Sequence, residues 1–258
     1  MKQRIIFGIL MAVLFLIPFY VGGYFFTFFT LALALMVFYE YSTIIKIRLF
    51  GTKFFVGIFG IILMFSPLLF DWNSQLQIRV LLALVVFFIT TTVFNRGFSI
   101  EKAGTVLIGV LYIGFGFESM AEARLDRGAE WTFVVLLTIW ATDSGAYFIG
   151  KQFGKNKLAQ AISPNKTIEG ALGGIITALV IGFSLQAALG AYQSYMNTLI
   201  ITLVVSVAGQ VGDLVESGLK RHYGVKDSGR IFPGHGGVFD RLDSWIFVFI
   251  GLKLIGVI

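Results

Sequence analysis

Acidic residues at helical spacing are the part of this chain best suited to chemistry. Asp213 and Glu216 are three residues apart. Asp240 and Asp243 repeat that spacing, which places the members of each pair on one face of a helix. Clustered carboxylate oxygens suit hard cations, and Mg²⁺ typically takes one or two carboxylates together with substrate phosphates. The pattern predicts a metal site. The alternative is that these acids only form salt bridges with neighbouring bases.

The segment around the two acidic pairs is also basic. Arg binds phosphate through paired hydrogen bonds, and Lys binds it as a point charge. Five bases are candidates for this role: Lys220, Arg221, Lys226, Arg230 and Arg241. Attraction to anionic lipid headgroups is the alternative explanation of such a cluster.

A glycine pair stands shortly before the second acidic pair. Gly236 and Gly237 allow close approach of the backbone to a ligand. The helix expected just after them favours anions at its N-terminus, and His235 beside them is suited to donate to a phosphate. Attraction to lipid headgroups does not explain a His-Gly-Gly sequence followed by two acids at helical spacing. This order of residues favours a phosphate site.

Two further stretches contain candidate residues. Asp143 lies inside an apolar run, where a carboxylate costs about 2.5–3.5 kcal/mol and is usually functional. Ser163 and Pro164 are typical of a helix start, with Ser as the cap and Pro in the first turn. Lys166 and Thr167 would then lie at the mouth of the next helix, where they could bind a phosphate.

The composition indicates a membrane protein. The 258 residues are 57% hydrophobic and only 13% charged, whereas soluble domains have about 25% charged residues. The excess apolar surface must face lipid. Cysteine is absent, which excludes disulfides and thiolate metal sites. We interpret the net charge of +6 as a sign of membrane topology, and we expect no nucleic-acid partner.

Apolar stretches long enough to cross a bilayer set the expected fold class, an all-α polytopic membrane protein of about nine helices. The first stretch follows Lys2 and Arg4 but has no small-residue cleavage site, so we expect a retained helix rather than a signal peptide. The stretches are approximately 5–20, 24–45, 54–70, 76–94, 104–123, 131–150, 168–190, 196–216 and 239–257.

The basic residues predict the orientation. With nine spans, 16 of the 20 bases fall on the side of the N-terminus, and the other four are Arg79, Arg124, Arg127 and Lys253. This asymmetry places the N-terminus in the cytoplasm. The two longest cytoplasmic connections, about 151–167 and 217–238, have room for a site. We therefore divide the chain into N-terminal membrane helices, residues 1–130, and a C-terminal catalytic membrane region, residues 131–258.

Two packing questions stay open in the sequence. Glu40 lies near the cytoplasmic end of the second stretch, with Lys46 as an available partner. The glycine-rich seventh stretch, with Gly170, Gly173 and Gly174, could pack within one chain or between two, so a homodimer is one expectation.

The segment from Ser217 to Asp243 resembles the signature of the phosphatidate cytidylyltransferase (CDP-diacylglycerol synthase) family. The resemblance continues upstream through Gly212-Asp213-Leu214 and Glu216, Ser163-Pro164 with Lys166-Thr167, and Asp143-Ser144-Gly145-Ala146-Tyr147. The first five helices are similar only in being hydrophobic. The matching residues are Ser217, Leu219, Lys220, Arg221, Lys226, Asp227, Gly229, Phe232, Pro233, His235, Gly236, Gly237, Val238, Asp240, Arg241, Leu242 and Asp243.

The resemblance implies an enzyme that makes CDP-diacylglycerol and pyrophosphate from CTP and phosphatidic acid, with Mg²⁺ and a possible second cation. It implies an integral protein of the bacterial inner membrane with its site facing the cytoplasm. The implied metal ligands are Asp213, Asp240 and Asp243, and the implied catalytic residues are Asp213, Asp240, Lys220, Arg241 and His235. The implied substrate-binding residues are Asp143, Ser163, Lys166, Thr167, Glu216, Ser217, Arg221, Lys226, Asp227, Gly236 and Gly237.

Two other functions are weighed against this one. A different lipid-phosphate transferase, such as a CDP-alcohol phosphotransferase, would carry a DGxxAR pattern that this chain lacks. A transporter for an anionic solute would need polar residues through the whole bilayer depth, whereas here they gather toward one face.

Overall fold

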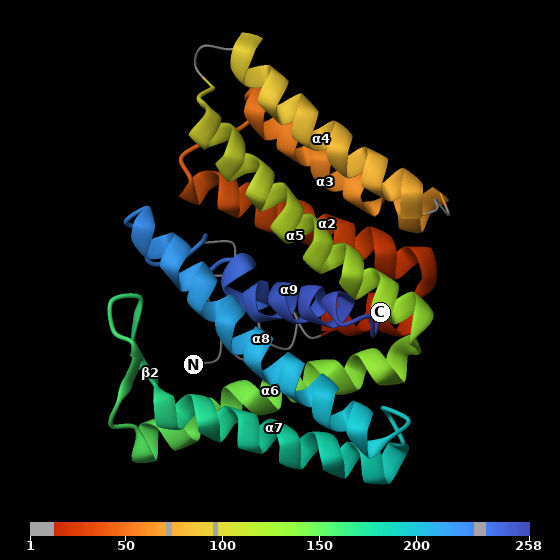
Figure 1. Ribbon diagram of the computed structural model, residues 1–258, viewed down its shortest axis with the longest axis vertical. Coiled ribbons are helices and arrows are strands. Elements are labelled where there is room, and N and C mark those ends of the chain that lie inside the picture. The colour runs from red at the N-terminus through yellow and green to blue at the C-terminus, as the bar shows by residue number, and fades with distance from the viewer. Residues whose placement is uncertain (1–12, 71–73, 95–97, 230–235) are drawn as a thin grey trace. The chain divides into compact units, whose positions relative to one another are not determined.

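The computed structural model describes residues 13–70, 74–94, 98–229 and 236–258, and these are mostly helical (Figure 1). Residues 13–21 form a helical segment that precedes a break at Gly22 and Gly23, both with positive φ. The remaining helices are α2 (Gly23–Ile44), α3 (Thr52–Phe70), α4 (Ser74–Phe94), α5 (Ile100–Asp126), α6 (Gly128–Phe153), α7 (Ile168–Leu189), α8 (Tyr195–His222) and α9 (Phe239–Leu254).

The helices agree with the predicted apolar stretches, each of which overlaps one of them. Within the described residues, six helices are long and apolar enough to cross a membrane, namely α2, α3, α5, α6, α7 and α8. The expected class, an α-helical polytopic membrane protein, is therefore confirmed. The count of nine crossings stays a prediction.

One boundary differs in a way that matters for the site. The eighth apolar stretch was expected to end near residue 216, but α8 continues to His222. Mean hydropathy falls where charged residues begin, but the backbone hydrogen bonds of the helix continue past that point. Ser217, Lys220 and Arg221 are therefore helical, although the sequence placed them in a connection.

The chain forms two compact units. Unit 1 comprises residues 1–122 and 227–239. Its interior is aromatic, and Phe26, Phe38 and Phe65 are fully buried. The ring of Phe38 on α2 lies where a side chain at Gly57 of α3 would be, so these two helices pack closely.

Unit 2 comprises residues 123–226 and 240–258. Helices α6 and α7 lie side by side along their length (Figure 1). A Cβ atom at Gly174 would lie 2.8 Å from the carbonyl oxygen of Thr142, and one at Gly170 would lie 2.8 Å from that of Ala146. The glycine-rich face of α7 thus packs within one chain. The homodimer stays a prediction.

A β-hairpin interrupts the helices of unit 2. Strand β1 (Lys157–Ala159) pairs antiparallel with β2 (Ser163–Thr167). The expectation that Ser163 and Pro164 start a helix is therefore wrong. A residue before Pro is biased toward extended backbone, and Pro fits an edge strand because it has no N–H to pair.

The cap of α7 is Thr167, at the end of β2. Its Oγ1 accepts a hydrogen bond from the backbone N–H of Gly170 at 3.1 Å. Glu169 accepts backbone hydrogen bonds from Lys155 and Asn156 at 3.1–3.2 Å, and Asn156 Nδ2 donates to it at 2.7 Å. Glu169 therefore holds the residues that lead into the hairpin, and Lys166 is available to pair with another acid.

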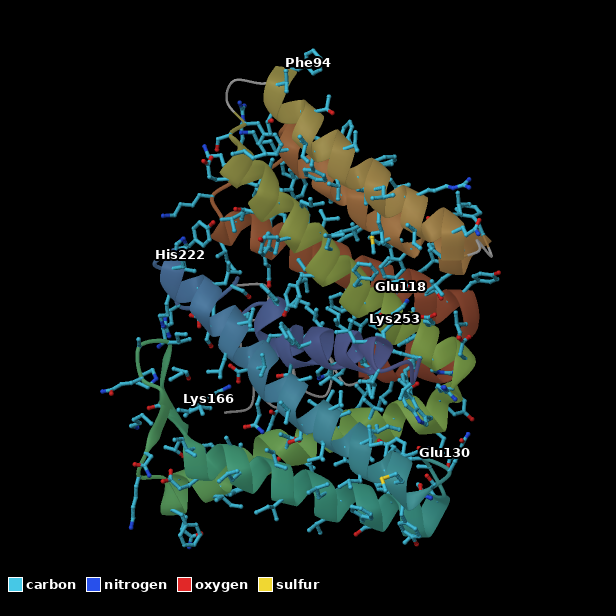
Figure 2. All side chains as sticks on the ribbon, in the orientation of Figure 1. Phe94, Glu118, Glu130, Lys166, His222 and Lys253 are labelled. Carbon is cyan, nitrogen blue, oxygen red and sulfur yellow. The ribbon has the colours of Figure 1, made fainter. Side chains whose placement is uncertain are left out.

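Charged residues mark the two ends of unit 2. Figure 2 shows Lys166 and His222 toward one end of this unit and Glu130 and Lys253 toward the other. At the second end, Arg127 Nε donates to the carbonyl oxygen of Val257 at 2.8 Å. This separation agrees with the predicted sidedness of the loops. Which end faces the cytoplasm stays a prediction.

Candidate active site

The site is built where α8 crosses α9 within unit 2. A Cβ atom at Gly212 would lie 2.8 Å from both the carbonyl oxygen of Asp243 and Cβ of Phe247. The absence of a side chain at Gly212 therefore lets the two backbones approach. Asp213, the next residue on α8, is brought to the first turn of α9 in this way.

The two acidic pairs meet at one cavity of about 390 Å³. Five acidic and two basic side chains line it, so its formal charge is negative when all are ionised. These residues are Asp143, Asp213, Glu216, Asp240 and Asp243, with Lys220 and Arg241. Trp140, Ser244 and Trp245 complete the lining.

Lys220 bridges the two helices in this cavity. Its Nζ lies 2.5 Å from Glu216 Oε2 and 2.7 Å from Asp240 Oδ1. The side chains are nearly buried, with 11% of Lys220, 1% of Glu216 and 11% of Asp240 exposed. The salt bridges that were the alternative to a metal site are thus present in part, with Lys220 as the shared cation.

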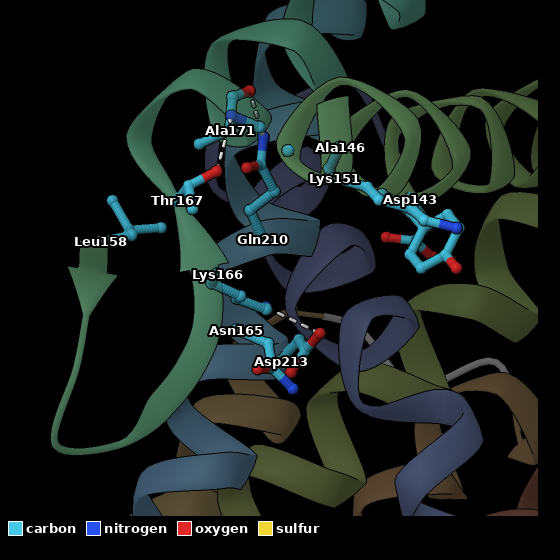
Figure 3. Close-up of a pocket in the computed structure, with 13 residues that line it drawn as sticks. Asp143, Ala146, Lys151, Leu158, Asn165, Lys166, Thr167, Ala171, Gln210 and Asp213 are labelled. Carbon is cyan, nitrogen blue, oxygen red and sulfur yellow. Dashed lines mark hydrogen bonds and ion pairs between the residues drawn. The ribbon is translucent and has the colours of Figure 1, made fainter. Parts of the chain in front are cut away.

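Asp213 pairs with a base from the hairpin. Lys166 Nζ, at the end of β2, lies 2.7 Å from Asp213 Oδ2 (Figure 3). Ser217 Oγ donates to Asp213 Oδ1 at 3.3 Å. About a third of each partner in the ion pair is exposed, 27% of Lys166 and 38% of Asp213. A bound ligand can therefore reach this pair.

A second cavity, of about 530 Å³, adjoins the first. Asp143 and Asp213 line both cavities. The second one is mostly apolar and lies between α6, the hairpin, α7 and α8 (Figure 3). Its lining also includes Ala146, Tyr147, Gly150, Lys151, Leu158, Asn165, Lys166, Thr167, Gly170, Ala171 and Gln210.

Several predicted site residues lie outside both cavities. Arg221 donates to the carbonyl oxygens of Ile162 and Val225 at 3.3 Å, so it links the hairpin to α8 and the turn that follows. Ser163 belongs to β2, and Lys226 and Asp227 are exposed after α8.

The predicted loop residues near α9 are only partly described. Gly236 and Gly237 lie directly before α9, and Gly236 has a φ of 83°. His235 and Arg230 lie outside the described residues. The proposed roles of all these residues stay predictions.

The donor atoms of the charged cavity fit a hard cation. Glu216 Oε1 is buried and has no hydrogen-bond partner in the described part of the chain. Asp243 is 8% exposed, and its Oδ1 accepts a hydrogen bond from the backbone N–H of Ser244 at 2.7 Å. Among the described residues, no three His, Asp or Glu side chains already surround a common ion position. The residues thus supply the right chemistry, while lysines occupy part of the space between the acids.

Two residues that line the apolar cavity, Lys151 and Gln210, were not predicted as site residues. Gln210 Nε2 donates to the carbonyl oxygen of Ala171 at 3.3 Å, which joins α8 to α7. Lys151 Nζ lies 5.8 Å from the ring centre of Tyr147. A polar Gln one turn before Asp213 in an apolar helix was a usable signal, because intramembrane polar groups are rarely idle.

Comparison with known proteins identifies similar chains. A family model described as "Cytidylyltransferase family" matches residues 2–257. The phosphatidate cytidylyltransferase of Bacillus subtilis is 42% identical over 257 residues, which cover 96% of this chain and 94% of that one. Those of Staphylococcus haemolyticus and Staphylococcus aureus are 40% and 38% identical, and each alignment covers 96% of both chains.

Proposed function

This chain belongs to the cytidylyltransferase family, and from that premise we propose that it acts as a phosphatidate cytidylyltransferase. It transfers the cytidylyl group of CTP to phosphatidic acid, giving CDP-diacylglycerol and pyrophosphate. The observation that carries this proposal is the pair of adjoining cavities, one charged and one mostly apolar, that share Asp143 and Asp213. Such a pair suits a reaction between a charged nucleotide and a lipid.

The apolar cavity receives the lipid substrate. Tyr147 in its wall is 61% exposed, and its neighbour Phe148 is 66% exposed. Exposed aromatic and aliphatic side chains on a membrane helix face lipid, so the acyl chains can stay in the bilayer. The phosphate of phosphatidic acid then meets Lys166, the cation at the junction with the charged cavity.

The charged cavity receives the triphosphate. Lys220 and Arg241 are the bases in its lining, and both bind phosphate oxygens well. Carboxylates outnumber these bases, so an anionic nucleotide would be repelled unless a cation accompanied it. Bound Mg²⁺, held by Asp213, Asp240 and Asp243, would neutralise charge on the phosphates. This balance of charge supports the proposal of a metal-dependent enzyme.

The reaction is an in-line displacement. A phosphate oxygen of phosphatidic acid attacks the α-phosphorus of CTP, and the bond from that phosphorus to the bridging oxygen of the β-phosphate breaks. Pyrophosphate leaves with that electron pair. A phosphate monoester is already largely ionised at pH 7, so no strong base is needed. Lys166 orients the attacking phosphate, and Lys220 and Arg241 stabilise charge on the equatorial and leaving oxygens.

The predicted setting is the bacterial inner membrane, with the charged cavity facing the cytoplasm. The bacterial relatives and the excess of bases at the predicted cytoplasmic loops support this. A tag on the N-terminus should resist protease added to intact cells, and cleavage there would contradict the orientation.

The test of the function is transfer of label from CTP to lipid. Purified protein in detergent is incubated with CTP labelled in the cytosine ring, phosphatidic acid and Mg²⁺, with an EDTA control. We expect metal-dependent label in the lipid phase and release of pyrophosphate. Folded protein that transfers no label would contradict the proposal. Uptake of CTP or phosphate by proteoliposomes without transfer would favour the transporter.

A further inference from the structure

A buried carboxylate in unit 1 binds the residues that lead into α9. Glu40, one turn before the end of α2, is 1% exposed. Its Oε1 accepts a hydrogen bond from the backbone N–H of Val238 at 2.9 Å, and its Oε2 accepts one from Phe239 at 2.8 Å. Ser228 Oγ donates to Oε2 at 2.9 Å. Both ends of the stretch between Ser228 and Phe239 are therefore held by one side chain.

The position of Glu40 is unfavourable in its own helix. A negative charge near a helix C-terminus opposes the helix dipole, whereas one at a helix N-terminus is stabilised. The first N–H groups of α9 have no carbonyl partner within that helix, and the fork of the Glu40 carboxylate meets two donors at its start. Lys46 forms no ion pair with Glu40 among the described residues. The charge of Glu40 is thus placed to serve α9.

Two glycines of the signature lie against this carboxylate. The atoms nearest to a Cβ at Gly229 would all belong to the side chain of Glu40, and those nearest to a Cβ at Gly237 would belong to Glu40 and Ser228 Oγ. What excludes a side chain at either glycine is therefore contact with the Glu40 carboxylate and its neighbour, and not the backbone conformation. The carboxylate and the small residues therefore form one arrangement, contributed by α2 and by the segment before α9.

We propose that Glu40 is a positioning residue, which fixes the start of α9 and thereby the acids of its first turn. Asp240 follows Phe239 directly in α9, and Asp243 comes three residues later. The inference rests on the proposed function in assigning these acids to the reaction. It gives a role in that reaction to a helix for which the sequence alone predicted none.

Four variants separate positioning from general stability. Glu40→Gln keeps the size of the side chain but removes its charge and turns an amide N–H₂ toward one of the donors. Glu40→Ala removes the fork. Ser228→Ala removes one donor. Ser42→Ala is the matched control, because Ser42 is fully buried on the same helix and its Oγ has no partner among the described residues.

The first readout is amide hydrogen exchange, which needs no substrate. We expect the amides at the start of α9 to exchange about tenfold faster or more in Glu40→Gln and Glu40→Ala, and to be unchanged in Ser42→Ala. The second readout is steady-state kinetics. We expect kcat to fall about tenfold or more, with KM for phosphatidic acid little changed. Normal exchange and normal kcat in Glu40→Gln would overturn the proposal.

A double-mutant cycle with Gly229→Ala makes the test specific. In the presence of Glu40, the added methyl group meets the carboxylate, so kcat should fall. In the Glu40→Ala background the nearest atoms to that methyl group are absent, so the same change should cause less further loss, and the two effects should not add. Additive effects would show that Gly229 and Glu40 act independently and would overturn the proposal.

The outcomes distinguish this inference from the proposed function. If the unaltered protein transfers no label from CTP, the proposed function fails, and hydrogen exchange still decides whether Glu40 holds the start of α9. If the unaltered protein is active and Glu40→Gln does not fold, Ser228→Ala decides. Ser228→Ala with unchanged exchange and unchanged kcat would then refute the proposal.

Discussion

The closeness of α8 and α9 at Gly212 gives a sharp prediction, because the same helix offers a matched control. In Gly212→Ala, the new Cβ would lie 2.8 Å from two atoms of α9, the carbonyl oxygen of Asp243 and Cβ of Phe247. That is about 0.6 Å short of ordinary contact at 3.4 Å. Neither atom is the end of a flexible side chain, so the helices must move apart. In Gly209→Ala, one turn earlier, the nearest atom is Val248 Cγ2 at 3.5 Å.

The two variants differ chiefly in this contact. Replacing Gly by Ala inside a helix stabilises by about 0.5–1 kcal/mol in either case. Overpacking costs about 1–3 kcal/mol and applies only at Gly212. The free energies of unfolding of the two variants should therefore differ by about 1–3 kcal/mol, because the propensity gain cancels. Gly209→Ala should be at least as stable as the unaltered protein.

Activity should follow the same order. A misplacement of about 1 Å can cost about a hundredfold in rate, so a shift of about half that distance between the acidic pairs should lower kcat about tenfold. The measurements are thermal unfolding in detergent and transfer of label from CTP to lipid, with both variants purified in parallel. If Gly212→Ala matches Gly209→Ala in stability and kcat, the close crossing does not position the site and the reasoning is wrong.

Three further predictions address the charged cavity. Lys220→Met leaves Glu216 and Asp240 without their shared cation. Removal of one partner from a buried pair should destabilise the protein by about 3–5 kcal/mol. The unfolding temperature should therefore be lower than in the exposed control Lys157→Met. Asp240→Asn should abolish label transfer while membrane insertion persists, and near-normal turnover would remove Asp240 from the metal site. In Lys166→Ala, KM for phosphatidic acid should rise more than KM for CTP, as measured by varying each substrate in turn. An equal rise of both KM values would contradict the assignment of Lys166 to the phosphate of the lipid substrate.

The sequence predicted the helices well because a bilayer imposes a length and a composition on any segment that crosses it. It predicted their ends less well, as α8 shows. Lys220 was assigned to a loop because hydropathy drops after residue 216. In the structure it lies four residues after Glu216 in the same helix and pairs with it. The charge pattern was visible in the sequence, but the continuing helix that sets its geometry was not.

The hairpin and Glu40 show what local patterns cannot reveal. Strands β1 and β2 are three and five residues long and carry no apolar alternation, so a helix start was the stronger local interpretation of Ser163 and Pro164. Lys46 was an available partner for Glu40, yet the partner Ser228 is 188 residues away in the sequence. A lone acid in an apolar helix signals a partner, but only the fold identifies it.

The two interpretations of the acidic pairs, a metal site and a set of salt bridges, are compatible once the charges are followed through the proposed reaction. Lys166 pairs with Asp213, and Lys220 pairs with both Glu216 and Asp240, in the described structure. Under the proposed function, bound phosphates would give the lysines new anionic partners, and the carboxylates of Asp213, Asp240 and Asp243 would then be available to hold Mg²⁺. Such an exchange would replace the ion pairs of Lys166 and Lys220 rather than only break them. Since loss of one partner from a buried ion pair is costly, such an exchange would limit the cost of binding, which is a physical reason for acids and bases to stand together in one segment of an otherwise apolar chain.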